Sequence, residues 1–232
     1  MPPERGRFLL LGSGEFEPWA ADAERFALAG AVGDGSVAVL ATASGREGEA
    51  VFERWTSLGL AHYESLDIRA HALRVRSRVD ALAVGTSSRL DEVSMVFFSG
   101  GSPKYLAQTI AGTPLWDAVL RLIERGGVFG GCSAGAMVAG ISRMPFPFGS
   151  GLDLLPGTAV GVHWDALSGW WIRWLRDLAP RRLPSQVSFF GIAEHTAIAS
   201  DGDAWHVFGS GVVDVRRGSE RHAATAGERF PR

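Results

Sequence analysis

The five residues Gly131-Cys132-Ser133-Ala134-Gly135 have the composition of a nucleophile elbow. A serine hydroxyl attacks a carbonyl only after a base takes its proton, and the elbow presents it on a tight strand-to-helix turn. Such a turn tolerates only small neighbours, which the glycines and alanines here supply. The following helix directs N–H groups at the reacting carbonyl. The pattern predicts a serine hydrolase with Ser133 as nucleophile; the alternative is a glycine-rich turn that contains a serine by chance.

The neighbouring Cys132 offers a second nucleophile, because glutamine amidotransferases of related architecture carry a cysteine in a G-x-C-x-G elbow. Centred on Cys132, that pattern requires glycine at position 134, which is alanine. Centred on Ser133, both glycines are in place. We therefore interpret Cys132 as a buried small apolar residue. A glutaminase that uses Cys132 is the weaker alternative.

A second glycine pair, Gly100-Gly101, follows the apolar run Val93–Phe98. Glycines at a strand end let the backbone approach a substrate and present N–H groups to it. The pair is a candidate for the other half of an oxyanion hole, although a plain turn would have the same sequence.

A base and an orienting acid must complete the chemistry. Six histidines are candidates for the base: His62, His71, His163, His195, His206 and His222. His163 has the best claim, because it ends the apolar run Ala159–Val162 downstream of the elbow. Glu194 follows the run Phe189–Ala193 and is a candidate acid, in competition with Asp153, Asp165 and Asp201. No two histidines have metal-ligand spacing, so we expect no metal site and no cofactor.

Short apolar runs alternate with helical patterns along the first two thirds of the chain. The expected strands are Phe8–Leu11, Val37–Ala41, Ala70–Val75, Val93–Phe98 and Val128–Gly130. The expected helices are Ala20–Gly30, Glu47–Leu58, a short one before Ala83, Pro103–Ile110, Pro114–Glu124 and Ala134–Ile141. This alternation predicts an α/β fold whose mostly parallel central sheet is covered on both faces, a three-layer sandwich. We expect the functional residues to lie at the carboxyl ends of its strands.

The chain changes character after Pro156. Residues Trp164 to Leu178 have the pattern of a Trp-rich amphipathic helix, and short antiparallel strands are expected from Val187 onward, with turns at Asp201-Gly202 and Gly209–Gly211. The indoles of this helix suit a pocket, the core or a homodimer contact, and packing is their commoner use. The tryptophans in question are Trp164, Trp170, Trp171 and Trp174. We find no repeat or linker, and expect a single domain over residues 1–232.

The composition narrows the classes of partner. The 232 residues carry a net charge of −2, which gives no argument for a nucleic-acid or anionic-membrane partner. The single cysteine forms no internal disulfide. No apolar run has the length of a signal peptide core or a membrane span, so a cytoplasmic protein is expected.

Four segments resemble the serine peptidase family that contains aspartyl dipeptidase and cyanophycinase, whose fold is similar to that of class I glutamine amidotransferases. The segments are VFFSGG at Val96–Gly101, GCSAGA at Gly131–Ala136, GLDLLPGTAVGVH at Gly151–His163 and GIAEHTAI at Gly191–Ile198. They occur in the family's order, and a closing GSGVVDV also resembles the cyanophycinase branch. The resemblance implies Ser133 as nucleophile, His163 as base and Glu194 as orienting acid. It also implies that the N–H groups of Gly101 and Ala134 form the oxyanion hole.

The chain departs from the family around the pocket. The dipeptidase branch carries its acid in the loop after the elbow helix, but Ser142–Phe148 contains no acidic residue, which favours Glu194. After Gly101 the family usually has an acidic or amide residue and then Gln, where this chain has Ser102-Pro103-Lys104. Trp164 stands where the family often has Phe.

These departures do not affect the predicted catalytic residues, but they leave the identity of the substrate undetermined. We expect a serine peptidase or amidohydrolase for a small peptide or isopeptide, with Gly100, Ser102, Lys104 and Trp164 as substrate-binding candidates. Lys104 suits an acidic substrate group, an Asp-containing substrate included; a solvated lysine is the simpler interpretation. A degenerate protein that only binds a ligand is the alternative from another class.

Overall fold

The computed structural model describes residues 6–142, 151–166 and 183–232. Its strands are β1 (Arg7–Leu11), β2 (Val37–Leu40), β3 (Ala70–Ala72), β4 (Met95–Phe98), β5 (Val128–Cys132), β6 (Thr158–Gly161), β7 (Ser188–Ile192), β8 (Thr196–Ser200), β9 (Ala204–Gly209), β10 (Val212–Arg217), β11 (Glu220–Thr225) and β12 (Arg229–Pro231). Its α-helices are α1 (Ala21–Ala29), α2 (Glu49–Ser65), α3 (Arg78–Leu82), α4 (Val84–Ser87), α5 (Pro103–Ile110), α6 (Pro114–Glu124) and α7 (Ala134–Met137). Short 3-10 turns lie at Pro18–Ala20, Thr42–Ser44 and Ser88–Leu90.

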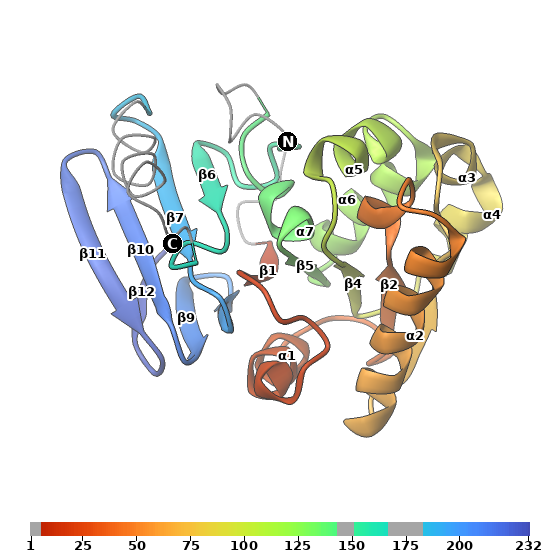
Figure 1. Ribbon diagram of the computed structural model, residues 1–232, viewed down its shortest axis with the longest axis horizontal. Helices are drawn as coiled ribbons and strands as arrows, with labels where there is room; N and C mark the ends of the chain where they lie inside the picture. Colours follow the sequence, from red (N-terminus) through yellow and green to blue (C-terminus); the bar gives the residue numbers. More distant parts are fainter. Residues whose placement is uncertain (1–5, 143–150, 167–182) are drawn as a thin grey trace.

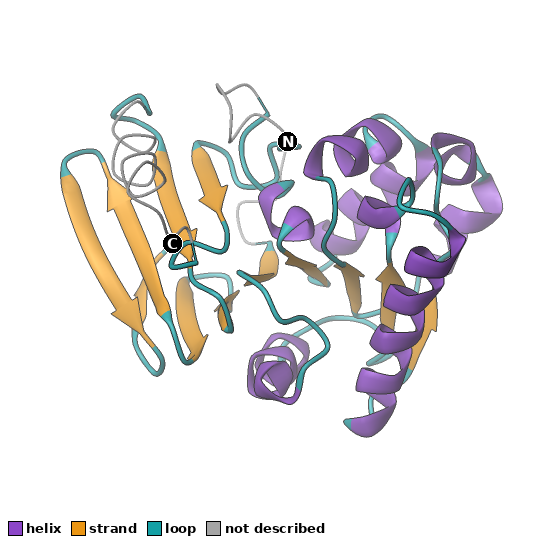
Figure 2. Cartoon of the chain, viewed as in Figure 1, coloured by secondary structure: helices purple, strands orange, loops and turns teal. Residues whose placement is uncertain are grey.

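A large mixed sheet forms the centre of the molecule (Figure 2). Its order is β12-β9-β8-β1-β5-β4-β2-β3. The strands β1, β5, β4, β2 and β3 pair in parallel, whereas β8, β9 and β12 continue the sheet antiparallel from β1. The five parallel strands therefore bring their carboxyl ends, including Gly100-Gly101 and the elbow, to one edge of the sheet.

Helices cover both faces of this sheet, as expected for a three-layer fold (Figure 1). Phe8 and Leu10 of β1 point into the core beneath α5 and α6, and Leu9 and Leu11 point into the core beneath α1. All four side chains are fully buried. A strand buried on both faces reads as a continuous apolar run, which explains the Phe8–Leu11 sequence.

A second sheet, of order β11-β10-β7-β6, was not expected from the sequence. In it β7, β10 and β11 pair antiparallel, as predicted for the strands after Val187, whereas the earlier strand β6 pairs with β7 in parallel. Phe190 of β7 faces the same core as β1, while Phe189 faces outward against Trp164. The second sheet is thus built onto the main core, and its strands β6 and β7 end close to the carboxyl edge of the central sheet.

Two helix ends differ from expectation for identifiable reasons. The helix expected to end at Leu58 continues through Gly59 to Ser65. A Cβ at Gly59 would lie 2.8 Å from Val39 and 2.9 Å from Phe16, so glycine lets α2 approach the sheet closely. The helix after the elbow ends at Met137 rather than Ile141. The carbonyls of Val138, Ala139 and Gly140 accept hydrogen bonds from residues 152–155 instead of from a further helical turn.

The remaining element predictions are met within one to three residues at each end. The predicted helices Pro103–Ile110 and Pro114–Glu124 have the observed bounds. Trp164 lies in a turn, and the rest of the predicted Trp-rich helix, with Trp170, Trp171 and Trp174, falls outside the described residues, as does most of the loop Ser142–Phe148. Across the described ranges, no helix is long and apolar enough to span a membrane.

Candidate active site

Ser133 lies in the turn between β5 and α7 with a backbone that L-residues seldom adopt. Its φ is 48° and its ψ is −110°. The two glycines of the pentapeptide make this turn possible. A Cβ at Gly131 would lie 2.4 Å from the carbonyl carbon of Gly135, and one at Gly135 would lie 2.1 Å from the carbonyl oxygen of Phe98. This strained, crowded geometry is that of a nucleophile elbow, and it accounts for both glycines.

The hydroxyl of Ser133 is hydrogen-bonded to a histidine, and that histidine to a carboxylate. Ser133 Oγ lies 3.1 Å from His163 Nε2, and His163 Nδ1 lies 2.9 Å from Glu194 Oε1. The carboxylate favours the tautomer with its proton on Nδ1, which leaves Nε2 to accept the serine proton. The side chains of His163 and Glu194 are 40% and 38% exposed, so the arrangement is open to a ligand from solvent.

The second sheet brings His163 and Glu194 together. His163 follows β6 with a φ of 50°, and Glu194 follows the adjacent parallel strand β7. Trp164 N–H donates to the carbonyl of Ile192 at 3.1 Å, and Asp165 Oδ1 accepts the N–H of Glu194 at 2.7 Å. These two bonds join the turn that carries the histidine to the turn that carries the acid.

The oxyanion candidates Gly101 and Ala134 lie on the two turns that flank Ser133. Gly101 has a φ of 135°, and a Cβ there would lie 2.6 Å from the carbonyl of Ala43. Within the described ranges, neither Gly101 N–H nor Ala134 N–H has a hydrogen-bond partner. Gly100 N–H does have one, since it donates to Glu15 Oε1 at 2.8 Å. Gly101 and Ala134 are therefore the N–H groups available to a ligand oxygen.

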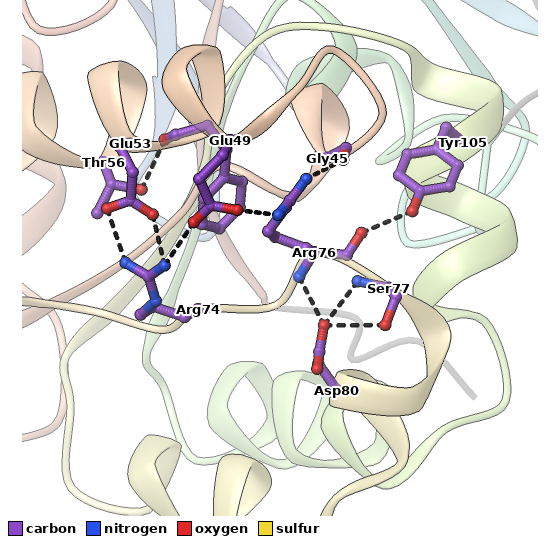
Figure 3. A network of polar contacts seen from close by, with 10 residues as sticks. Gly45, Glu49, Glu53, Thr56, Arg74, Arg76, Ser77, Asp80 and Tyr105 are labelled. Carbon is purple, nitrogen blue, oxygen red and sulfur yellow. Dashed lines mark hydrogen bonds and ion pairs between the residues drawn. The ribbon is translucent and has the colours of Figure 1, made fainter.

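A polar network joins the segment Gly45–Glu53 to the segment Arg74–Asp80 and to Tyr105 at the start of α5 (Figure 3). Ser102 N–H donates to Ala43, and the Tyr105 hydroxyl donates to the carbonyl of Arg76 at 2.6 Å. Arg76 in turn donates to Gly45 and pairs with Glu49. The network fixes the loop after β2 against the start of α5, and so fixes the wall against which Gly101 packs.

Cys132 is unsuited to attack a substrate. Its side chain is fully buried, and burial together with the nearby Glu15 raises the pKa of its thiol well above the ordinary value. A thiol is nucleophilic only as the thiolate, so the geometry agrees with the interpretation of Cys132 as a packing residue.

Four of the competing side chains are engaged in other contacts, whereas Asp165 lies beside Glu194 and accepts its N–H. His62 pairs with the buried Glu24 at 2.6 Å, and His206 pairs with Asp201 at 2.8 Å. Asp201 follows β8, which runs antiparallel to β1, so it lies at the opposite edge of the sheet from the elbow. Asp153 accepts hydrogen bonds from Ser142.

The substrate-binding candidates have different surroundings. Gly100, Ser102 and Lys104 lie at or just after the oxyanion turn, and the Ser102 hydroxyl caps α5 by accepting from Tyr105 N–H. Trp164 does not join them. It is 8% exposed, its ring centroid lies 4.7 Å from that of Phe189, and its indole N–H donates to the buried Asp214. It packs the outer face of the second sheet.

Sequence reasoning missed two residues near this site. Glu15, in the loop after β1, reaches the oxyanion turn from a position 85 residues away in sequence. Arg46 stacks on Tyr105, with its guanidinium carbon 4.5 Å from the ring centroid. No motif marks either residue. In the parts of the chain that the structure describes, no cluster of three metal-ligating side chains occurs.

Comparisons with known proteins agree with this fold. The family model described as peptidase family S51 matches residues 8–147. The crystal structure of a peptidase from an acI-B1 Actinobacterium is similar over 98% of this chain and 97% of that chain, with 31% identity and a TM-score of 0.85. A candidate peptidase E from Listeria monocytogenes EGD-e, at 18% identity and a TM-score of 0.58 over 96% and 99% of the two chains, shares the fold. No curated protein gives a significant match.

The fold and these comparisons define the class of the protein as a serine peptidase hydrolase. The chain belongs to peptidase family S51, because the family model covers more than half of it and a peptidase of 31% identity matches nearly its whole length. The resemblance to the aspartyl dipeptidase and cyanophycinase family is confirmed.

Proposed function

We propose that the protein hydrolyses a small peptide or isopeptide through an acyl-enzyme on Ser133, with His163 as base and Glu194 as orienting acid. The observation that carries the proposal is the continuous pair of hydrogen bonds, 3.1 Å from Ser133 Oγ to His163 Nε2 and 2.9 Å from His163 Nδ1 to Glu194 Oε1. Each partner has the geometry that general-base activation of a serine requires.

In the first half-reaction, Ser133 Oγ attacks the scissile carbonyl while its proton passes to His163 Nε2. The negative oxygen of the tetrahedral intermediate is stabilised by the N–H groups of Gly101 and Ala134. The intermediate collapses when His163 returns the proton to the leaving amine. In the second half-reaction, water loses its proton to His163, attacks the acyl-enzyme and releases Ser133. Glu194 stabilises the imidazolium in both halves.

An acidic group near the scissile bond is the substrate feature we favour. Arg74 and Arg76 are paired with Glu49 and Glu53, but Lys104, three residues after Gly101, and Arg46, which stacks on Tyr105, have no carboxylate partner among the described residues. Unpaired cations beside a reaction centre favour an anionic ligand group. We therefore include Asp-containing dipeptides and isopeptides among the substrates.

The alternative is a ligand-binding protein that has lost turnover. The intact hydrogen bonds of Ser133 and His163 argue against it, because a degenerate site has no need of the strained backbone at Ser133. Nothing in the site itself favours a nucleic-acid or membrane partner. We also keep the cytoplasm as the proposed location, which cell fractionation tests.

The experiment is product release from a dipeptide and isopeptide library that includes Asp-X and beta-Asp-Arg members. Wild type is compared with Ser133→Ala and with Cys132→Ala, a matched control at the adjacent position. We expect cleavage by wild type and by Cys132→Ala, and a loss of several orders of magnitude in Ser133→Ala. Equal turnover by Ser133→Ala would contradict the serine mechanism. Tight binding of a library member without cleavage would favour the ligand-binding alternative.

A further inference from the structure

Glu15 is a buried carboxylate beside the nucleophile that the proposed mechanism leaves unused. The residue is 9% exposed, and its Oε1 accepts the Gly100 N–H at 2.8 Å. A Cβ at Gly100 would lie 3.0 Å from Glu15 Oε1 and 3.5 Å from Ser133 Cβ. The side chains of Glu15 and Ser133 therefore lie on the same side of Gly100.

The backbone around Glu15 is held in an unusual conformation. Gly14 has a φ of 69° and Phe16 a φ of 65°, so a left-handed residue stands on each side of Glu15. The Gly14 carbonyl accepts the indole N–H of Trp19 at 2.9 Å, and the Phe16 ring packs 5.3 Å from that of Phe97. Non-glycine residues in this region persist only where their surroundings enforce them, and such residues gather at functional sites.

The charge of Glu15 has no compensating cation within ion-pair distance among the described residues. Burial of an unpaired carboxylate is unfavourable, so hydrogen bonds must stabilise the carboxylate in place. The carboxylate accepts the Gly100 N–H and also contacts the buried Cys132 thiol, and bonds from a backbone N–H to a carboxylate are the stronger kind. Gly100 directly precedes Gly101, whose N–H is free for a substrate oxygen.

We propose that Glu15 is a positioning residue, whose carboxylate fixes the Gly100 peptide so that the Gly101 N–H is aimed at the oxyanion. Glycine pairs are flexible, and the turn Gly100-Gly101 has no side chain of its own to fix it. An N–H group stabilises a transition state only where it is already oriented before the reaction. The loop after β1 thus holds the turn that follows β4. This inference rests on the proposed function of Ser133.

The test uses an alkyl fluorophosphonate, because the natural substrate need not be known. Ser133 Oγ bonds to phosphorus, fluoride leaves, and the serine proton passes to His163, while a phosphoryl oxygen occupies the oxyanion site. The rate constant of labelling is measured by intact-protein mass for wild type, Glu15→Ala, Glu15→Asp and Glu15→Gln. Glu17→Gln is the matched control, since Glu17 is 52% exposed and pairs with His195.

We expect Glu15→Ala and Glu15→Asp to be labelled about 10- to 100-fold more slowly, because one lacks the acceptor and the other is too short to reach Gly100. Glu15→Gln keeps an acceptor oxygen, so its rate should stay within about threefold of wild type. With a substrate from the library, Glu15→Ala should lower kcat with little change in KM.

Three outcomes would overturn the inference while leaving the proposed function intact: labelling of folded Glu15→Ala at the wild-type rate, a loss in Glu15→Gln as large as in Glu15→Asp, or a rise in KM alone. If Glu15→Ala does not fold, the comparison of Glu15→Asp with Glu15→Gln decides. Labelling of wild type that persists in Ser133→Ala, or no labelling of wild type, would instead contradict the proposed function.

Discussion

Ser133 and His163 are hydrogen-bonded at 3.1 Å and both have left-handed backbones, with φ values of 48° and 50°. Ser133 follows β5 and His163 follows β6, and these two strands belong to different sheets. A sharp turn immediately after a strand projects the side chain out of the sheet edge, where it can meet a partner. The positive φ at both residues therefore lets side chains from two sheets meet at the proposed reaction centre.

Glu194 should be needed for rate rather than for binding. In Glu194→Gln the amide no longer favours the Nδ1-protonated tautomer of His163, and we expect kcat to fall about 10²- to 10⁴-fold. Steady-state kinetics on a cleaved library member measures the effect. Asp201→Asn makes the same chemical change at the opposite edge of the sheet and should keep the wild-type kcat. A normal rate in Glu194→Gln would exclude Glu194 as the acid.

Cys132 should resist alkylation in the native protein. Its thiol is buried, so iodoacetamide cannot reach it, and its raised pKa keeps it from forming the reactive thiolate. Mass spectrometry should show no adduct after treatment that modifies the cysteine fully in guanidinium chloride, and activity should be unchanged. Rapid modification with parallel loss of activity would revive the glutaminase alternative.

Gly135→Ala should destabilise the fold. The new Cβ would lie 2.1 Å from the Phe98 carbonyl oxygen, so the elbow or the end of β4 must move. We expect a loss of about 1–3 kcal/mol in the free energy of unfolding, measured by urea denaturation. Gly85→Ala is the control: a Cβ there meets nothing within 4 Å, and the helical position favours alanine. Equal stability of the two variants would contradict the crowding argument.

Acid should weaken the fold partly through Asp214. Despite burial, which raises it, the pKa of Asp214 is lowered overall because Arg216 and Arg221 donate to its carboxylate. A lowered folded pKa means that the stabilisation is present above the unfolded value of about 3.9 and is lost as pH falls below it.

Urea denaturation between pH 2.5 and pH 6 measures this contribution. Asp214→Asn should be less stable than wild type near pH 6, and the difference should shrink as the pH falls. The pKa of Asp201 is lowered to about 2, chiefly because Ala204 N–H donates to its carboxylate. Asp201 therefore also stabilises the fold above its unfolded pKa, and it is present in both proteins. A pH-independent difference between the two proteins would contradict the assignment to Asp214.

Lys104 should matter only for acidic substrates. The residue is exposed in the first turn of α5, where a positive charge opposes the helix dipole, so its loss should not weaken the helix. For a substrate with an acidic group we expect Lys104→Ala to raise KM by up to about fivefold, the limit of an exposed ion pair. Neutral substrates provide the control. An unchanged KM for both classes would support a solvated lysine.

The sequence by itself determined the elements that local chemistry dictates. Glycines on both sides of Ser133 indicated the elbow, because that turn has no room for a Cβ at either position. Proline at the first helical position and a capping Ser102 or Thr113 defined the starts of α5 and α6. The alternation of apolar runs and helices predicted a parallel sheet, and the family resemblance named His163 and Glu194.

Only the tertiary structure decided what depends on contacts between distant segments. Whether a short apolar run such as Ala159–Val162 joins the central sheet or a second one is fixed by pairing partners, which leave no local pattern. The continuation of α2 past Leu58 depends on the sheet, because Gly59 lets the helix lie close to Val39 and Phe16. Glu15 could not be found in advance, because a single buried carboxylate has no motif, and its partner Gly100 lies 85 residues further along the chain.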